Sequence, residues 1–119
     1  MNNERILELA DRIGRARHHR QDGPWPDSDS LTAFNMVAWH CGSVGCIGGW
    51  AMHMFHGEND AMDDGTDAVA QLLDITNEQA NSLCYPDLPA GMRYDDVTPA
   101  RAASVLRRFA ETGEVEWQP

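Results

Sequence analysis

The stretch that decides the fold reads Trp39-His40-Cys41-Gly42-Ser43-Val44-Gly45-Cys46-Ile47-Gly48-Gly49-Trp50. It combines two cysteines, four glycines and two tryptophans within twelve residues, and His53 and His56 follow one helical turn later. An ordinary core helix or surface loop does not need this mixture. Three interpretations fit it: a tightly packed part of the core, a thiol site and a metal site.

The first interpretation is structural, and it needs no ligand. Cysteine is among the most buried residue types and behaves as a small hydrophobe. Glycines allow positive φ angles and close helix crossings, and Trp39 and Trp50 would flank such a crossing with large buried surfaces. Apolar residues continue on one side of a helix that we expect over residues 46–55. We prefer this interpretation.

The two chemical interpretations use the same side chains. Cys46 lies where the helix is expected to begin, and a helix N-terminus lowers the pKa of a thiol. With His53, or else His40 or His56, as the base and amides of the glycine-rich turn as an oxyanion hole, Cys46 would be the nucleophile of a thiol hydrolase. A structural zinc ion would instead be held by Cys41, Cys46, His53 and His56. Only six residues separate Cys46 from His53, a spacing that matches no standard zinc finger.

Helical signals extend outward from this stretch in both directions. Apolar residues recur at three- and four-residue spacing over residues 4–17. Thr66 is placed to cap a second helix, and residues 76–79 (Thr-Asn-Glu-Gln) are a capping box that opens another. Residues 31–39 fit either a short helix or an extended segment, and residues 88–97 are expected to form a loop.

The C-terminal part of the chain has the clearest boundaries. Thr98 and Pro99 begin a helix that Gly113 ends, and the alternating tail after it either adds a short strand or docks Trp117. The sequence therefore predicts a compact, mainly α single domain over residues 1–119. It contains about four to six short helices and has room for one small β pairing.

Length and composition limit the class of protein. With 119 residues the chain is expected to form one domain with a single core, and its ordinary apolar content of 42% suggests neither a disordered nor a membrane class. No apolar run approaches the length of a transmembrane helix, and the N-terminus lacks the features of a signal peptide. We therefore expect a cytoplasmic protein without a cofactor, in which the three cysteines stay reduced.

The charge distribution indicates the kind of partner. The net charge is −10, and residues 57–100 hold ten acids against one base. Such a chain is repelled by nucleic acid and anionic membranes and attracted to basic protein surfaces. The arginines of residues 1–20 are better explained as a solvated face than as a nucleic-acid site. The acids predicted to contact a protein partner are Glu58, Asp60, Asp63, Asp64, Asp67, Asp95 and Asp96.

The central stretch also resembles a segment found in small uncharacterised phage and proteobacterial proteins. Their usual form is a tryptophan followed by Cys-Gly-Thr-x-x-Cys-Ile-Ala-Gly-Trp-Ala; here Ser43 replaces the threonine and Gly48 the alanine. Such proteins often also share the segments at residues 98–106 and 112–117. The family has no established activity, so the resemblance transfers no catalytic residue. It implies a phage or mobile-element setting.

Two hypotheses of function follow from these patterns. In the first, the chain is a non-enzymatic, phage-associated inhibitor that imitates the charge of nucleic acid and occupies the basic groove of a host nucleic-acid-handling or defence complex. In the second, the Cys/His residues of the central stretch form a zinc or thiol site. The sequence does not determine the oligomeric state.

Overall fold

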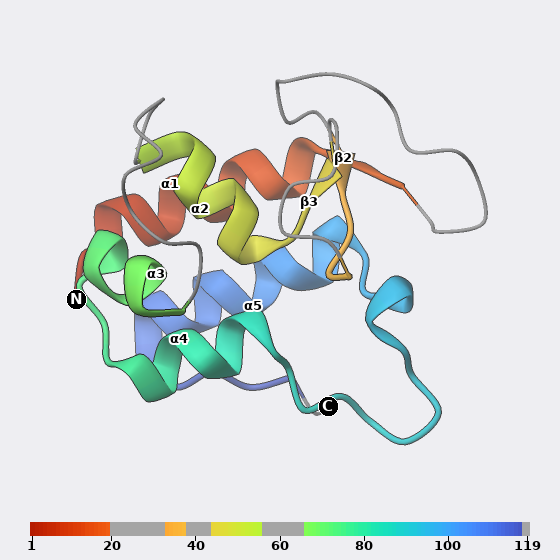
Figure 1. The fold of residues 1–119 in the computed structure, drawn as a ribbon. Helices are drawn as coiled ribbons and strands as arrows, with labels where there is room; N and C mark the ends of the chain where they lie inside the picture. Colours follow the sequence, from red (N-terminus) through yellow and green to blue (C-terminus); the bar gives the residue numbers. More distant parts are fainter. Residues whose placement is uncertain (20–32, 38–43, 56–65, 118–119) are drawn as a thin grey trace.

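Helices account for most of the residues that the computed structural model describes, which are 1–19, 33–37, 44–55 and 66–117 (Figure 1). Within these ranges three two-residue strands and one short 3₁₀ helix complete the secondary structure. In chain order the elements are α1 (Asn3–Arg15), β1 (Arg17–His18), β2 (Ala33–Phe34), β3 (Val44–Gly45), α2 (Ile47–Phe55), α3 (Thr66–Leu73), α4 (Asn77–Cys84), η1 (Tyr94–Asp96) and α5 (Pro99–Thr112).

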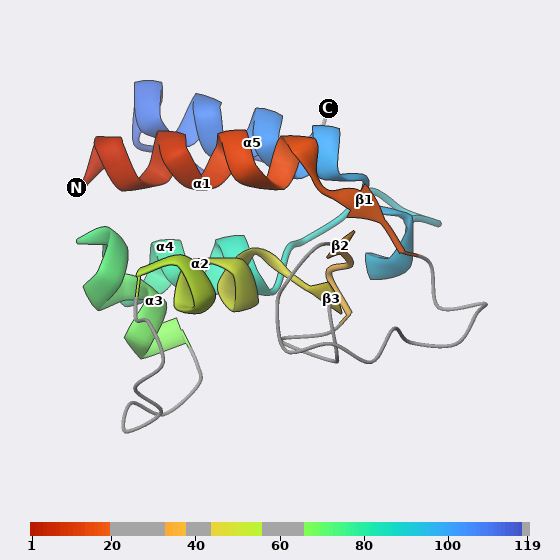
Figure 2. The ribbon, with the colours of Figure 1, turned by 90° about the horizontal axis from the view of Figure 1, so that it is seen from above.

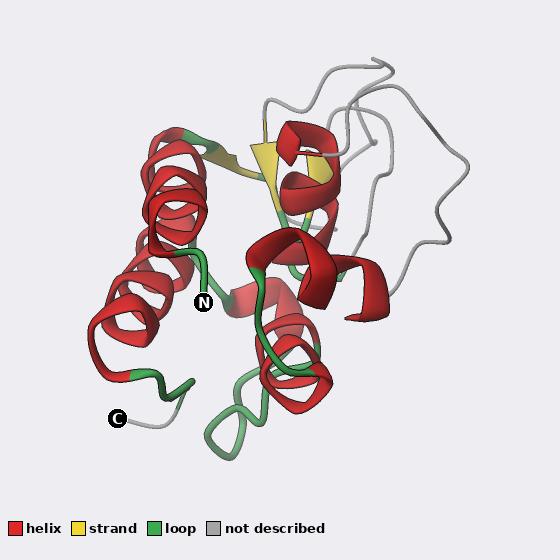
Figure 3. Cartoon of the chain, turned by 90° about the vertical axis from the view of Figure 1, so that its left-hand side faces the viewer, coloured by secondary structure: helices red, strands yellow, loops and turns green. Residues whose placement is uncertain are grey.

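The helices form two layers. Figures 2 and 3 show α1 and α5 side by side in one layer, with α2, α3 and α4 in the other. Small residues let α1 and α5 approach closely: a Cβ atom built on Gly14 would lie 3.3 Å from the Cβ of Ala103. None of the helices in the described ranges is long and apolar enough to span a membrane.

Local capping interactions fix where the helices begin and end. The hydroxyl of Thr76 accepts a hydrogen bond from the backbone N–H of Gln79, whose side chain accepts one from the backbone N–H of Thr76 in return. At the start of α5 the hydroxyl of Thr98 accepts a hydrogen bond from the backbone N–H of Arg101, and Gly113 ends the helix with a φ of 76°. The capping box and both ends of the last helix are therefore as the sequence predicts.

The strands form a small parallel sheet beside the C-terminal end of α1. β2 is the middle strand, and Phe34 is paired with His18 on one side and with Gly45 on the other. The pairing continues for one more hydrogen bond, from the backbone N–H of Asn35 to the carbonyl oxygen of Gly45, at 3.1 Å. The sheet thus joins the end of α1 to the start of α2.

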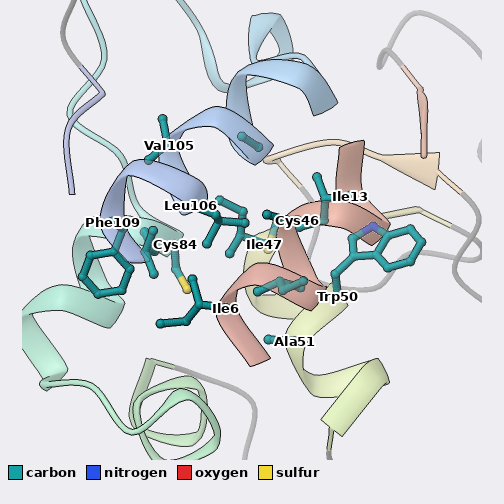
Figure 4. Close-up of a cluster of buried hydrophobic side chains, with 14 of the residues drawn as sticks. Ile6, Ile13, Cys46, Ile47, Trp50, Ala51, Cys84, Val105, Leu106 and Phe109 are labelled. Atoms are coloured by element: carbon teal, nitrogen blue, oxygen red, sulfur yellow. The ribbon is translucent and has the colours of Figure 1, made fainter. Parts of the chain in front are cut away.

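The core lies between the two layers, where apolar side chains from all five helices are buried. Trp50 is 3% exposed, and its indole N–H donates to the carbonyl oxygen of Ala33 at 3.1 Å, which ties α2 to the sheet. Figure 4 shows the centre of this core. Its labelled residues are Ile6, Ile13, Cys46, Ile47, Trp50, Ala51, Cys84, Val105, Leu106 and Phe109.

The predicted fold class is confirmed, with differences at two places. The first helix ends at Arg15 instead of residue 17, because the chain then enters β1. The loop predicted over residues 88–97 contains the short 3₁₀ helix η1. Of the two alternatives predicted for the tail, the structure has the docked Trp117, which is 4% exposed, and residues 114–117 form no strand.

Candidate functional site

Cys46 lies immediately before α2, as the sequence indicates, but its side chain is buried. It is 2% exposed, as is Cys84 at the end of α4, and both are free thiols (Figure 4). Backbone hydrogen bonds from Gly48 and Gly49 act to lower the pKa of Cys46, but desolvation by burial outweighs them and raises it. The helix N-terminus therefore does not produce an activated thiolate here.

Burial has the same effect on the second thiol. Desolvation raises the pKa of Cys84 well above its ordinary value, and the neighbouring Cys46 raises it further. A buried, protonated thiol is a poor nucleophile and a poor metal ligand, because both functions need the thiolate. In the described residues Cys46 and Cys84 therefore act as small core side chains.

The other residues of the Cys/His hypothesis are only partly described. His53 lies on α2, half-buried, with its ring edge against Trp50 at 6.4 Å between centroids. Cys41 and His56 lie outside the described residues, so the four-ligand zinc site stays a prediction. Within the described ranges, no three or more His, Cys, Asp or Glu side chains are grouped to hold a metal.

Six of the seven predicted acidic contact residues fall into three groups. Asp67 is exposed on the first turn of α3, as a contact residue should be. Asp96 is half-buried, and its carboxylate accepts a hydrogen bond from the backbone N–H of Arg93. The remaining predicted acids of the preceding segment lie outside the described residues: Glu58, Asp60, Asp63 and Asp64.

Asp95 is a correction to the predicted contact surface. Its residue is 5% exposed, because η1 turns the side chain inward to Asn35, whose amide donates to Asp95 Oδ1 at 2.7 Å. The guanidinium of Arg93 covers the carboxylate from outside, at 3.7 Å from Oδ2. Asp95 therefore stabilises the fold and does not contribute to an exposed acidic surface.

Asn35 is the centre of a buried polar cluster that the sequence did not reveal. It is fully buried, and besides Asp95 it donates to the carbonyl oxygen of His19 at 2.7 Å and accepts from the backbone N–H of Val37 at 2.8 Å. His18 Nε2 lies 3.0 Å from the carbonyl oxygen of Asp95. The cluster joins the ends of β1 and β2 to η1.

No sequence signal could have found this cluster. Asn35 and Asp95 are 60 residues apart, and each also fits an ordinary loop. The two side chains are hydrogen-bonded to each other, as buried polar groups require, so the arrangement fits a structural role.

Charge is divided unequally between the two layers. α1 and α5 together carry six arginines against four acids. Residues 66–92, which include α3 and α4, carry four acids and no arginine or lysine. All four of these acids are exposed: Asp67, Asp74, Glu78 and Asp87.

Several arginines of the α1–α5 layer are held by groups of the protein itself. Arg5 donates to the carbonyl oxygen of Leu72 at 2.8 Å and lies over the ring of Phe55. The guanidinium of Arg101 donates to the carbonyl oxygen of Trp117. Two more arginines form ion pairs: Arg15 with Asp11, and Arg108 with Glu116. Of the N-terminal arginines, these contacts hold Arg5 and Arg15, and the absence of a nucleic-acid site there stays a prediction.

Comparison with protein-family models, with curated proteins and with solved structures finds no match for this chain. The resemblance of the central stretch to small phage and proteobacterial proteins therefore stays a prediction. The function must be argued from the residues themselves.

Proposed function

We propose that this protein is a small, non-enzymatic binding protein whose acidic side contacts a basic surface on another protein. The observation that carries the proposal is the separation of charge between the layers: residues 66–92 present four exposed acids and no base. The sequence just before them, residues 57–65, adds four more acids and again no base. A surface whose charges all have the same sign accelerates association with a partner of opposite charge.

The state of the cysteines supports a binding role over thiol chemistry. Burial keeps Cys46 and Cys84 protonated, and both are packed among apolar side chains of the core. A hydrolase would need its nucleophile within reach of a substrate. In a reducing cytoplasm, where we place the protein, such thiols persist without forming disulfides.

The more specific form of the proposal concerns the partner. The resemblance of residues 39–51 to phage and proteobacterial proteins implies a mobile-element setting. A natural target there is a host complex that handles nucleic acid, because its basic groove binds a polyanion. An acidic protein of net charge −10 would compete for that groove and would itself be repelled by nucleic acid and anionic membranes.

The test is a pull-down with the tagged full chain from host lysate, at low and at moderate salt, with the bound proteins identified by mass spectrometry. A basic nucleic-acid-binding complex should be recovered at low salt and lost as salt rises, because salt screens exposed charges. With that complex purified, the triple variant Asp63→Asn, Asp64→Asn and Asp67→Asn should associate about tenfold more slowly at low salt.

The matched control removes the same number of charges from the other layer: Glu4→Gln, Glu8→Gln and Glu111→Gln, all exposed on α1 and α5. This variant should associate no more slowly than the parent protein. Equal slowing of both variants would show that only net charge matters and would overturn the assigned surface. An empty pull-down at both salt concentrations would overturn the proposal and favour the Cys/His hypothesis.

A further inference from the structure

The solvent-facing side of α1 and α5 is the surface of the molecule opposite to the layer of α2, α3 and α4 (Figure 2). We call it the outer face. Exposed positions on each of its two helices are spaced by four, three and four residues, which keeps them in one row along the helix. The rows consist of Glu4, Glu8, Asp11 and Arg15 on α1, and of Ala100, Ser104, Arg107 and Glu111 on α5. Leu7 is 47% exposed beside the first row, so α1 also carries an uncovered apolar side chain.

Acidic residues gather at one end of the outer face. α1 and α5 run antiparallel, so the last turn of α5 lies beside the first turns of α1 (Figure 2). Glu4 and Glu8 occupy the first two turns of α1, and Glu111 lies in the last turn of α5. In the described part of the chain, none of these three carboxylates takes part in an ion pair. We call the three residues the acidic end.

Arginines gather at the opposite end of the outer face. Arg12 and Arg15 lie in the last turn of α1. Arg107 of α5 belongs to the same end, because its Nη2 atom would lie 3.7 Å from a Cβ atom built on Gly14. Arg15 is paired with Asp11. Arg12 and Arg107 form no ion pair with any residue that the structure describes. We call the three arginines the basic end.

The stability of a single chain does not explain this arrangement. The dipole of α1 favours the order found there, with an acid in the first turn and bases in the last. On α5, however, Glu111 lies in the last turn, where the negative end of the helix dipole repels a carboxylate. Glu4 and Glu8 are one turn apart, and like charges at this spacing destabilise a helix. Both placements are unfavourable in one molecule, and both become favourable when a basic surface covers the acidic end.

We propose that the protein forms a homodimer in which the outer faces of two copies meet. A two-fold axis across the face rotates the second copy by half a turn, so that the acidic end of each copy lies on the basic end of the other. Any other partner would need charges of both signs in the reverse order over the same length. A second copy supplies this order by symmetry, and the contact also covers Leu7 of both copies.

The charge on the rest of the molecule is compatible with this contact. The net charge is −10, and charge repulsion opposes the association of two copies. The four exposed acids of residues 66–92, however, lie in the other layer, so the dimer places them on its two far sides (Figure 3). The acidic side of each copy therefore stays free for a basic partner, and the inference does not depend on the proposed function.

Sedimentation velocity on the full chain tests the dimer. At concentrations up to about 200 μM, a species of twice the mass of the chain should form and increase with concentration by mass action. Two charge-reversal variants should dimerise at least about tenfold more weakly, because each brings like charges together: Glu4→Arg with Glu8→Arg, and Arg12→Glu with Arg107→Glu. An equimolar mixture of the two variants should restore the species of twice the chain mass, since arginines of one variant then meet carboxylates of the other.

A matched control separates the outer face from the effect of net charge. Asp67→Arg with Glu78→Arg changes the net charge by the same amount as Glu4→Arg with Glu8→Arg, but in the layer of α3 and α4. This control should dimerise at least as strongly as the parent protein, because it reduces the net negative charge. Circular dichroism checks that every variant keeps the helix content of the parent.

A measurement on the parent protein alone locates the contact without any variant. In two-dimensional NMR, the backbone amide shifts of Leu7, Glu8 and Gly14 should change with protein concentration, and that of Glu78 should not. A parent chain that stays monomeric up to about 200 μM would overturn the inference. So would a mixture of the two charge-reversal variants that stays monomeric, equal weakening by the control, or shifts confined to residues outside α1 and α5.

Discussion

Replacing Asn35 with alanine tests the buried polar cluster that joins the sheet to η1. The Asn35 side chain takes part in three hydrogen bonds, at 2.7, 2.7 and 2.8 Å, and the residue is fully buried. The variant leaves three groups without this partner: the buried carboxylate of Asp95 and the part-buried carbonyl oxygen of His19 and N–H of Val37. Water cannot replace the amide easily, because Asp95 is itself only 5% exposed.

The expected loss follows from the kinds of bond removed. A hydrogen bond to a carboxylate contributes about 1.5–3 kcal/mol and a neutral one about 1 kcal/mol. One bond of the first kind and two of the second give a loss of about 3.5–5 kcal/mol in the free energy of unfolding. Since a domain of this size has about 5–15 kcal/mol in total, Asn35→Ala should remain folded but be severely destabilised.

Urea unfolding followed by circular dichroism measures this loss. The control is Asn77→Ala, at the exposed first residue of α4, which should change the stability by less than about 0.5 kcal/mol. In a double-mutant cycle, Asn35→Ala and Asp95→Ala should lose about 1–3 kcal/mol less together than the sum of the two single losses. A loss below about 1 kcal/mol for Asn35→Ala, or strictly additive losses, would refute this account of the cluster.

Three further predictions concern the thiols and the last helix. Because burial raises the pKa values of Cys46 and Cys84 above the ordinary 9.0, only the unfolded chain releases these protons just above that pH. Ionisation of the two thiols should therefore leave the free energy of unfolding unchanged below about pH 9 and lower it above that pH, by up to about 1.4 kcal/mol per pH unit for each thiol. In Cys84→Ala this free energy should decline less steeply with pH, as measured by urea unfolding at pH values up to about 10.5. Thr98→Ala removes the hydroxyl that accepts from the N–H of Arg101 and should cost about 1 kcal/mol, measured by thermal unfolding; an unchanged midpoint would exclude the cap. Gly113→Ala should cost about 1 kcal/mol through its φ of 76° alone, since no atom lies within 4 Å of the added methyl group, and a much larger loss would contradict the open environment.

The helices and their ends could be predicted because their signals are local. The capping box at Thr76, the N-cap at Thr98 and the glycine at 113 act within one or two helical turns, so a few neighbouring residues suffice to identify them. The same holds for the acidic character of residues 57–92, which is a property of composition.

The candidate sites depended on contacts that no local pattern contains. Cys46 lies at the start of a helix, and this local position predicts a lowered pKa. The pKa of the thiol is instead raised, because residues of other helices bury it. Asp95 lies within an acidic run, yet Asn35 from the sheet draws it inward. Trp117 of the tail and Ser82 of α4, 35 residues apart in sequence, are joined by a hydrogen bond and line one surface pocket.

The sequence by itself determined the class of fold, the ends of the helices that carry a capping signal and the charge of each segment, since hydrophobic periodicity and capping act over short distances. Tertiary structure alone decided which thiols are buried, which acids face solvent and where a pocket forms. Desolvation and hydrogen bonding between distant segments control these properties, and both arise only when the layers have packed.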